Sequence, residues 1–192
     1  MKMDTSNVLL TSLYKYYENE SNMNKLITVL NDGNNVSLRI IDWFVTNFSK
    51  KHNICYNLYR TDNKKITFNE KGNELHKVFN TYHAYKSQLK SYSKKRFDPF
   101  CRRERISFTC KNGSMIETTI GQLNFFKWAI DNLILDFIED NYEEIEIDMN
   151  SSYNNIKKQK KNSKERKKRQ ELSKSASRGL NLNNYKVVLS FN

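Results

Sequence analysis

The sequence predicts an α+β fold that is mostly helical, with two small β-hairpins, a basic linker and a C-terminal β-strand. Three observations lead to this prediction. One proline and five glycines in 192 residues leave long stretches free of helix breakers. Apolar residues recur at helical spacing in most of residues 1–150, and two pairs of strand-like segments each flank a turn. The 11 Tyr and 11 Phe supply the apolar surface for a core, although only 38% of the residues are hydrophobic.

Residues 1–72 are predicted to hold three helices followed by a β-hairpin. The helices are expected at residues 8–18, 23–30 and 38–50. Ser37 is the expected N-cap of the third helix, which is apolar nearly all round. The strands are expected at residues 54–59 and 65–68. A winged helix has this order of elements, but the third helix is too apolar to read a DNA groove. A winged-helix-like N-terminal part is therefore one interpretation among several.

Residues 73–150 are predicted to contain a long helix, a second hairpin and another helix. These elements are expected at residues 74–92, 106–110, 114–118 and 122–138. Asn112 and Gly113 suit the type I′ turn of a two-stranded hairpin, because both residues tolerate a positive φ angle. Thr119 or its neighbour Thr118 is the expected N-cap of the last helix.

Beyond residue 150 the composition changes to a basic and polar segment. Of the 33 Lys and Arg residues, 12 lie after Asn150, together with only 2 of the 21 acidic residues. Nine of the thirteen residues in the stretch 157–169 are basic. Residues 151–184 lack apolar periodicity, so we expect a flexible basic linker or at most a solvated helix. Residues 185–192 alternate apolar and polar side chains again, which predicts a C-terminal strand.

The sequence shows no constellation of catalytic or metal-binding residues. His76 and His83 are seven positions apart, and we interpret them as surface residues on one helix. Cys101 stands beside Arg102 and Arg103, which would lower the pKa of its thiol, but no motif makes it a nucleophile. Phosphate-binding and hydrolase motifs are missing from the sequence. We therefore expect a non-enzymatic protein without cofactor or metal, and no segment that spans a membrane.

Basic residues give the strongest functional signal. Residues 60–105 hold thirteen basic and five acidic residues, whereas residues 106–150 hold two basic and nine acidic ones. The aromatic residues interleaved with the first group are Tyr82, Tyr85, Tyr92, Phe97 and Phe100. This mixture is typical of surfaces that bind phosphates and stack bases. The predicted nucleic-acid-binding residues are Lys86, Lys90, Lys94, Lys95, Arg96, Arg102, Arg103, Lys157, Lys158, Lys160, Lys161, Lys164, Arg166, Lys167, Lys168 and Arg169.

The expected partner is DNA or RNA, contacted through its phosphate backbone without readout of the base sequence. The like charges of residues 157–169 repel one another, and they gain most when they displace counterions from a polyanion. The same residues are also compatible with a nuclear-import signal. An alternative is that opposite charges neutralise each other across the fold or between subunits, by self-association through residues 136–148 and 157–169.

Three stretches of the sequence carry a resemblance to known proteins. They are YKSQLKSYSKKRFDPFCRRERI at residues 85–106, TTIGQLNFFKWAIDN at residues 118–132 and KKRQELSKSAS at residues 167–177. These stretches resemble segments of uncharacterised proteins of nucleocytoplasmic large DNA viruses, the mimivirus and phycodnavirus relatives. The resemblance implies a eukaryotic host cell, a cytoplasmic viral factory and a place in the virion, and the basic stretch adds the host nucleus. It implies no catalytic residue.

These observations predict a non-enzymatic viral nucleic-acid-binding protein that is associated with the packaged genome or with viral transcription. The alternative is a minor virion or capsid structural protein, which would link subunits through its basic linker and its C-terminal strand. Viral capsid or transcription proteins are the protein partners expected in these two cases.

Overall fold

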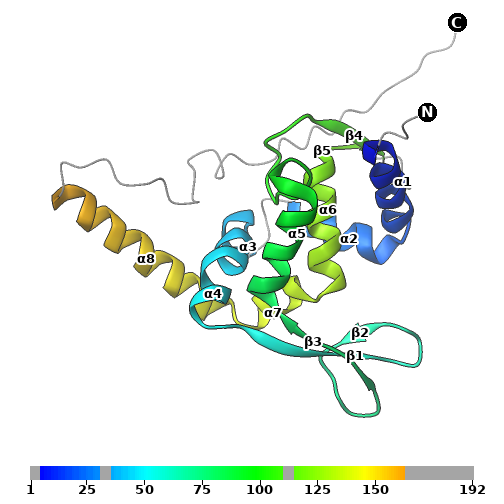
Figure 1. Ribbon diagram of the computed structural model, residues 1–192, viewed down its shortest axis with the longest axis horizontal. Helices are drawn as coiled ribbons and strands as arrows, with labels where there is room; N and C mark the ends of the chain where they lie inside the picture. Colours follow the sequence, from blue (N-terminus) through cyan, green and yellow to red (C-terminus); the bar gives the residue numbers. More distant parts are fainter. Residues whose placement is uncertain (1–4, 31–35, 110–114, 163–192) are drawn as a thin grey trace, which may run out of the picture.

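Helices dominate the fold and enclose one hydrophobic core, with two small antiparallel sheets at its margins (Figure 1). The computed structural model describes residues 5–30, 36–109 and 115–162. In this part of the chain the predicted class, α+β and mostly helical, is confirmed.

Helix α6, Ile120–Asp131, lies at the centre because it is apolar on nearly every side. Nine of its twelve residues are buried, and Phe125 and Phe126 are completely enclosed. The Oγ1 atom of Thr119 accepts a hydrogen bond from the backbone N–H of Gln122 at 3.1 Å. Thr119 is therefore the N-cap, one of the two candidates that the sequence offered.

Helices α1, Thr5–Tyr17, and α2, Glu20–Leu30, both pack against α6. They confirm the first two predicted helices, with boundaries that differ by no more than one helical turn. The side chain of Tyr17 is buried, and its hydroxyl donates a hydrogen bond to the backbone oxygen of Leu123 at 2.8 Å. This bond ties α1 to the central helix, because it satisfies a polar group that would otherwise be buried without a partner.

The third predicted helix forms as a continuous helical rod with a π-helical turn in its middle. Its parts are α3, Leu38–Trp43, then η1, Phe44–Phe48, and α4, Ser49–Lys51. The Oγ atom of Ser37 accepts a hydrogen bond from the backbone N–H of Ile40 at 3.3 Å, which confirms the predicted N-cap. Phe44 and Val45 are fully buried, so the rod contributes its apolar side chains to the core. The winged-helix interpretation stays a prediction.

Residues 74–80 form a strand, which corrects the helix predicted at residues 74–92. Strand β3, Glu74–Asn80, pairs antiparallel with β1, Cys55–Arg60. The other side of β1 pairs with β2, Ile66–Thr67, as the first predicted hairpin. The sheet order is therefore β2-β1-β3, and the end of the sheet that carries the two loops projects from the body (Figure 1).

Contacts with β1 explain why the helix starts late. Phe79 lies opposite Tyr56 in the strand register, and the centroids of their rings are 5.3 Å apart. The Oδ1 atom of Asn80 then accepts a hydrogen bond from the backbone N–H of His83 at 3.0 Å, so that Asn80 caps the helix α5, Thr81–Arg96.

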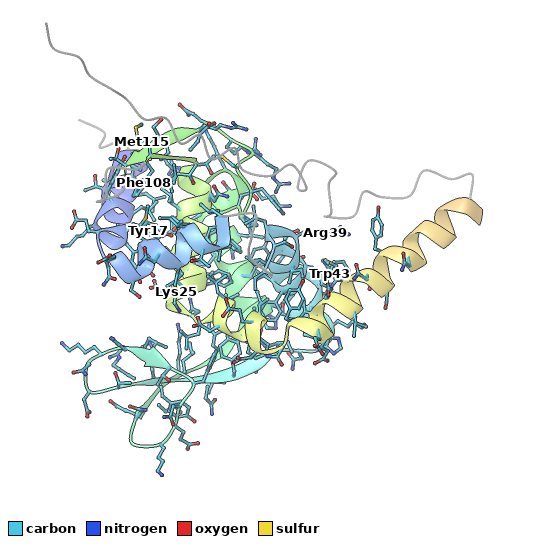
Figure 2. The ribbon with its side chains drawn as sticks, turned by 180° about the vertical axis from the view of Figure 1, so that it is seen from behind. Tyr17, Lys25, Arg39, Trp43, Phe108 and Met115 are labelled. Atoms are coloured by element: carbon cyan, nitrogen blue, oxygen red, sulfur yellow. The ribbon has the colours of Figure 1, made fainter. Side chains whose placement is uncertain are left out.

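Strands β4, Ile106–Thr109, and β5, Met115–Thr118, confirm the second predicted hairpin. The turn expected between them lies outside the described residues. Phe108 is buried, and its ring stacks on that of Tyr14 with centroids 4.5 Å apart. The hairpin is thereby attached to α1, beside which Phe108 is seen in Figure 2.

Leu133 breaks the helix that the sequence predicted at residues 122–138. Its φ angle is 52°, and a separate helix, α7, Ile134–Asp140, begins after it. The side-chain amide of the preceding Asn132 donates a hydrogen bond to the backbone oxygen of Trp128 at 2.6 Å. This bond satisfies a carbonyl at the end of α6, so the break is stabilised by local hydrogen bonding.

Helix α8, Tyr142–Asn162, is the longest helix in the described part of the chain, with 21 residues. Its first half packs against α3 and η1 through the buried Ile145 and Met149, and its second half projects from the body (Figure 1). The flexible-linker prediction is therefore wrong for residues 151–162, where the helical alternative applies. The strand predicted at residues 185–192 lies outside the described residues.

Candidate nucleic-acid interface

Helix α5 presents lysines to solvent because its opposite face is buried. Tyr85 is 7% exposed and packs in the core, whereas Lys86 and Lys90 are exposed. These two lysines are four positions apart, so they neighbour each other on the helix surface. Lys50 of α4 extends the row, because its Nζ atom lies 5.6 Å from the ring centroid of Tyr82, which is one turn before Lys86.

Ser93 interrupts the regular row of lysines. Its backbone angles are φ 56° and ψ 167°, so Lys94 does not continue the helical i, i+4 spacing of Lys86 and Lys90. The Oγ atom of Ser93 accepts a hydrogen bond from the backbone N–H of Lys95 at 3.3 Å and starts a new turn. Lys94 and Lys95 are both exposed. We call Lys50, Lys86, Lys90, Lys94 and Lys95 the α5 patch.

A glycine holds the last turn of α5 close to the central helix. A Cβ atom on Gly121 would lie 3.2 Å from the backbone oxygen of Lys95, which is tighter than most contacts of this kind. The side-chain amide of Asn124 also donates a hydrogen bond to the backbone oxygen of Arg96 at 2.9 Å. The half-buried Arg96 is therefore attached to α6 through its backbone. This contact holds the end of α5, which carries Lys94 and Lys95, in place against α6.

The two arginines after this turn differ in their surroundings. Arg102 donates two hydrogen bonds to the carboxylate of Asp98, at 2.9 and 2.7 Å, and its guanidinium lies 4.7 Å from the ring centroid of Phe100. The hydrogen bonds to Asp98 raise the pKa of Arg102 further above its usual value. Arg102 is thus a fixed structural cation, whereas Arg103 is exposed and in no ion pair with any described residue.

The lysines of the α5 patch share one electrostatic property. Within residues 5–30, 36–109 and 115–154, none of the five forms an ion pair with a carboxylate. The paired cations of this part are Lys25, Lys51, Arg102, Arg105 and Lys127. The alternative that opposite charges neutralise each other across the fold therefore does not account for the α5 patch.

The aromatic residues near the patch are not arranged as a stacking surface, which corrects that part of the prediction. Tyr85, Phe97 and Phe100 are at most 7% exposed. Tyr92 is half-buried and stacks on Phe97 with ring centroids 6.5 Å apart. Tyr82 is half-buried, with the ammonium of Lys50 over its ring. These rings stabilise the fold under the lysines, and bases are not offered an open ring.

The basic residues near the C-terminus divide into two groups. Lys157, Lys158, Lys160 and Lys161 lie on the projecting half of α8, where the sequence predicted a linker. The remaining predicted residues, Lys164, Arg166, Lys167, Lys168 and Arg169, lie outside the described part of the chain. The first group is therefore attached to the body by continuous helix rather than by a flexible tether.

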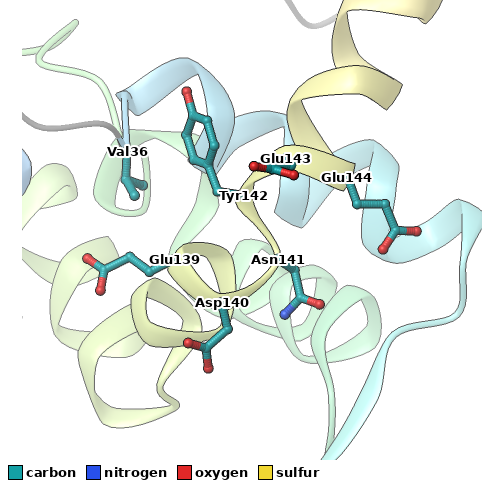
Figure 3. A pocket seen from close by; sticks show the side chains of 7 residues that line it. All are labelled: Val36, Glu139, Asp140, Asn141, Tyr142, Glu143 and Glu144. Atoms are coloured by element: carbon teal, nitrogen blue, oxygen red, sulfur yellow. The ribbon is translucent and has the colours of Figure 1, made fainter.

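Two members of the acidic stretch are paired within the chain. The carboxylate of Asp136 accepts a hydrogen bond from Lys25 at 2.8 Å. That of Asp148 accepts hydrogen bonds from the Nε1–H of Trp43 at 3.0 Å and from Lys51. The exposed acidic groups line a hollow of about 600 Å³ at the junction of α7 and α8 (Figure 3): Glu139, Asp140, Glu143 and Glu144. The negative charge of this hollow opposes phosphate binding there.

The sequence analysis did not include Lys50 among the binding residues, and its expectations for two histidines and one cysteine were wrong. The adjacent Lys50 and Lys51 at the end of the third helix were the signal that could have identified Lys50. His76 lies on β3 and His83 on α5, so they do not share a helix. Burial raises the pKa of the Cys101 thiol, which corrects the expected lowering.

Among the described residues, no three His, Cys, Asp or Glu side chains gather in a way that would hold a metal ion. None of the helices that the structure describes is both long and apolar enough to cross a bilayer.

The comparison with known proteins agrees with the sequence resemblance. The model of a family of unknown function, DUF7197, matches residues 1–178. The chain is also 38% identical over 143 residues to an uncharacterised protein of Acanthamoeba polyphaga mimivirus, covering 72% of this chain and 51% of that protein. It thus spans about half the length of this viral relative, and no solved structure matches it. These matches confirm the resemblance to uncharacterised proteins of nucleocytoplasmic large DNA viruses, and the chain belongs to the DUF7197 family.

Proposed function

We propose that this protein is a non-enzymatic viral nucleic-acid-binding protein that associates with the packaged genome or with viral transcription. The observation that carries the proposal is the α5 patch, five exposed lysines of which none is paired with a carboxylate of the described chain. The basic stretch at residues 157–169 adds nine cations. The proposed locations are the cytoplasmic viral factory, the virion and the host nucleus.

Phosphates are the ligand class that such lysines fit best. An unpaired lysine stays hydrated at the protein surface, and next to a nucleic acid it neutralises a phosphate and releases a condensed counterion into solution. The gain depends on the phosphate backbone and not on base identity, so the proposed binding is independent of sequence. Cations in a row along a helix can also contact several successive phosphates of a nucleic-acid backbone.

Charge reversal in the patch tests the proposal. We expect Lys86→Glu/Lys90→Glu/Lys94→Glu to weaken binding of a fluorescent DNA duplex by at least ten-fold at 100 mM salt, measured by anisotropy. The matched control is Lys64→Glu/Lys71→Glu, in which two exposed lysines of the sheet loops are reversed. The control should retain most of the affinity. A wild-type chain that does not bind DNA even at 20 mM salt would show that the proposal is wrong.

A structural role in the virion is the second candidate, and the open edge of the first sheet favours it. β3 is an edge strand of seven residues, and Leu75 and Val78 on it are 50% and 65% exposed. An open edge strand of this length that carries two exposed apolar side chains is suited to pairing with a strand of another chain. Salt-graded extraction of virions separates the candidates, because a genome-bound protein leaves with DNA and a structural one stays with capsid shells.

A further inference from the structure

We infer that the α5 patch binds double-stranded nucleic acid in preference to single strands. This inference rests on the proposed function and names the ligand class of the same site. It depends on two properties of the patch: the partial or complete burial of the three tyrosines of α5, and the density of its charge. Each property acts on the two ligands differently.

Single strands are held largely by stacking of their bases on aromatic side chains. Each stacked base contributes about 1–3 kcal/mol to binding. Tyr82 and Tyr92 are the two tyrosines of α5 that are not fully buried, and each already has a partner on its ring. A base that stacked on Tyr82 would have to displace Lys50, which is one of the cations that attract the phosphate. Stacking and charge therefore compete at this site.

Duplexes present more charge to the lysines. B-form DNA carries one negative charge per about 1.7 Å of its axis, twice the density of one strand of the same rise. The patch begins at Lys50 over Tyr82 and ends at Lys95, which follows Tyr82 by thirteen positions on α5. The helical part up to Lys90, eight positions after Tyr82, corresponds to roughly 12 Å, and Lys94 and Lys95 follow beyond the kink at Ser93. A duplex laid along the patch offers each lysine several phosphates, so bound counterions are released all along the row.

Two hollows lined by described residues do not favour the binding of unpaired bases. The hollow at the α7–α8 junction and a second one between α2 and α7 are both lined by Glu139. The second also includes Glu20 and Asp136. Carboxylates repel the backbone that would have to accompany a base into either hollow. The exposed lysines of α5 are thus better placed than these hollows to meet the phosphates on the outside of a duplex.

The test compares one 30-bp DNA duplex with its own single strand, on the full-length chain, by anisotropy between 50 and 200 mM salt. We expect the duplex to bind at least ten-fold more tightly at each salt concentration. The quadruple variant Lys86→Gln/Lys90→Gln/Lys94→Gln/Lys95→Gln should lose most of this ratio. Its plot of log affinity against log salt should become shallower by up to about four units, since each lost phosphate contact removes about one.

A second variant tests the aromatic side of the inference. Tyr82→Leu keeps most of the bulk of the side chain but removes the ring that lies against Lys50. The release of Lys50 should weaken both affinities alike, so the ratio of duplex to single-strand affinity should change by no more than two-fold. Equal or tighter binding of the single strand would overturn the inference, as would a full duplex preference in the quadruple variant or a selective loss of single-strand binding in Tyr82→Leu. Failure to bind either probe would instead overturn the proposed function.

Discussion

Asp148 ties α8 to the helical rod of α3, η1 and α4. Its carboxylate is only 10% exposed, and it accepts hydrogen bonds from Trp43 and Lys51, with His52 at 3.9 Å. Trp43 lies close to the packed half of α8 in Figure 2. Burial acts to raise the pKa of Asp148, but the hydrogen bonds from Lys51 and Trp43 outweigh burial and hold this pKa below its usual value.

Removal of this carboxylate should destabilise the fold. We expect Asp148→Ala to lower the free energy of unfolding by about 1–3 kcal/mol, because the indole N–H of Trp43 loses its acceptor. Urea denaturation measures the change. The control is Asp140→Ala, which removes an exposed carboxylate and should stay within about 0.5 kcal/mol of the wild type. Equal stability of Asp148→Ala and wild type would contradict the assigned hydrogen bonds.

The stability of the fold should depend on pH, because the pKa of Asp148 differs between the unfolded and the folded chain. In the unfolded chain Asp148 titrates near its ordinary pKa of about 3.9, whereas in the folded chain its pKa is lower. Its contribution is therefore fully present above that ordinary value and is lost as the pH falls through the folded-state pKa. The stability difference between wild type and Asp148→Asn should be largest near pH 6 and should shrink by pH 3. A constant difference in urea titrations would be inconsistent with this linkage.

Single residues were predictable where their role is local. Ser37 and Thr119 were expected caps, because an N-cap bonds to a backbone group only three positions along the chain. The largely buried position of Asp148 could not be predicted in this way, since its partner Trp43 is 105 positions away. Periodicity carries no information on such distant contacts. The same limit applies to Lys50, whose neighbour on α5 is found only in the folded chain.

At the scale of elements, the break in α5 is the least expected feature. The angles of Ser93, φ 56° and ψ 167°, belong to a region that is essentially restricted to glycine. A residue held there stores strain, and such strain is often found at ligand-binding surfaces. The strain at Ser93 separates Lys94 and Lys95 from the row of Lys86 and Lys90, so the patch curves instead of continuing along one straight face.

Substitution of Ser93 measures the stored strain. We expect Ser93→Gly to raise the free energy of unfolding by about 0.5–2 kcal/mol, because relief of about 1–3 kcal/mol of strain exceeds the backbone entropy that glycine loses. Ser93→Ala keeps the strain and removes the acceptor for the N–H of Lys95, so it should be destabilised. If thermal and urea unfolding show both variants less stable than wild type, the backbone at this position is not strained.

Element types were mostly predictable, and their ends were not. Leu75 and Phe79 are four positions apart, a spacing that suits one face of a helix. The same two residues also suit one face of a strand, and pairing with β1 decides in favour of the strand. For α8 the sequence did hold a signal. Glu143 and Glu144 in its first turn and lysines toward its end complement the helix dipole, which favours a continuous helix.

At the scale of the whole molecule, positive and negative groups are sorted onto different elements. The α5 patch is positive, whereas the α7–α8 junction is negative over Glu139, Asp140, Glu143 and Glu144. A charge distribution of this kind orients a polyanion before contact and raises its rate of association. The sorting was visible in the sequence as opposite charge balances in residues 60–105 and 106–150. The identity of the cations that stay unpaired could be learned only from the folded chain.

The free edge of β3 is a possible contact for self-association of the chain. At high protein concentration we expect wild-type chains to associate through this edge, and Val78→Lys to weaken the association, because a charged edge strand resists pairing. Sedimentation velocity at several concentrations measures the effect. Val8→Lys is the matched control, since Val8 is 56% exposed on α1 and away from the sheet. Identical sedimentation of all three proteins would exclude β3 as a contact.

The continuity of α8 has a mechanical consequence. Asp148 ties the packed half of the helix to the body, and Asn162 lies fourteen positions further on, roughly 20 Å along the axis. A helix of this length bends little, so its last turns project from the body (Figure 1). A chain that bound one stretch of genome with α5 and another with this tip would act as a spacer, setting the distance between neighbouring strands in a packed particle.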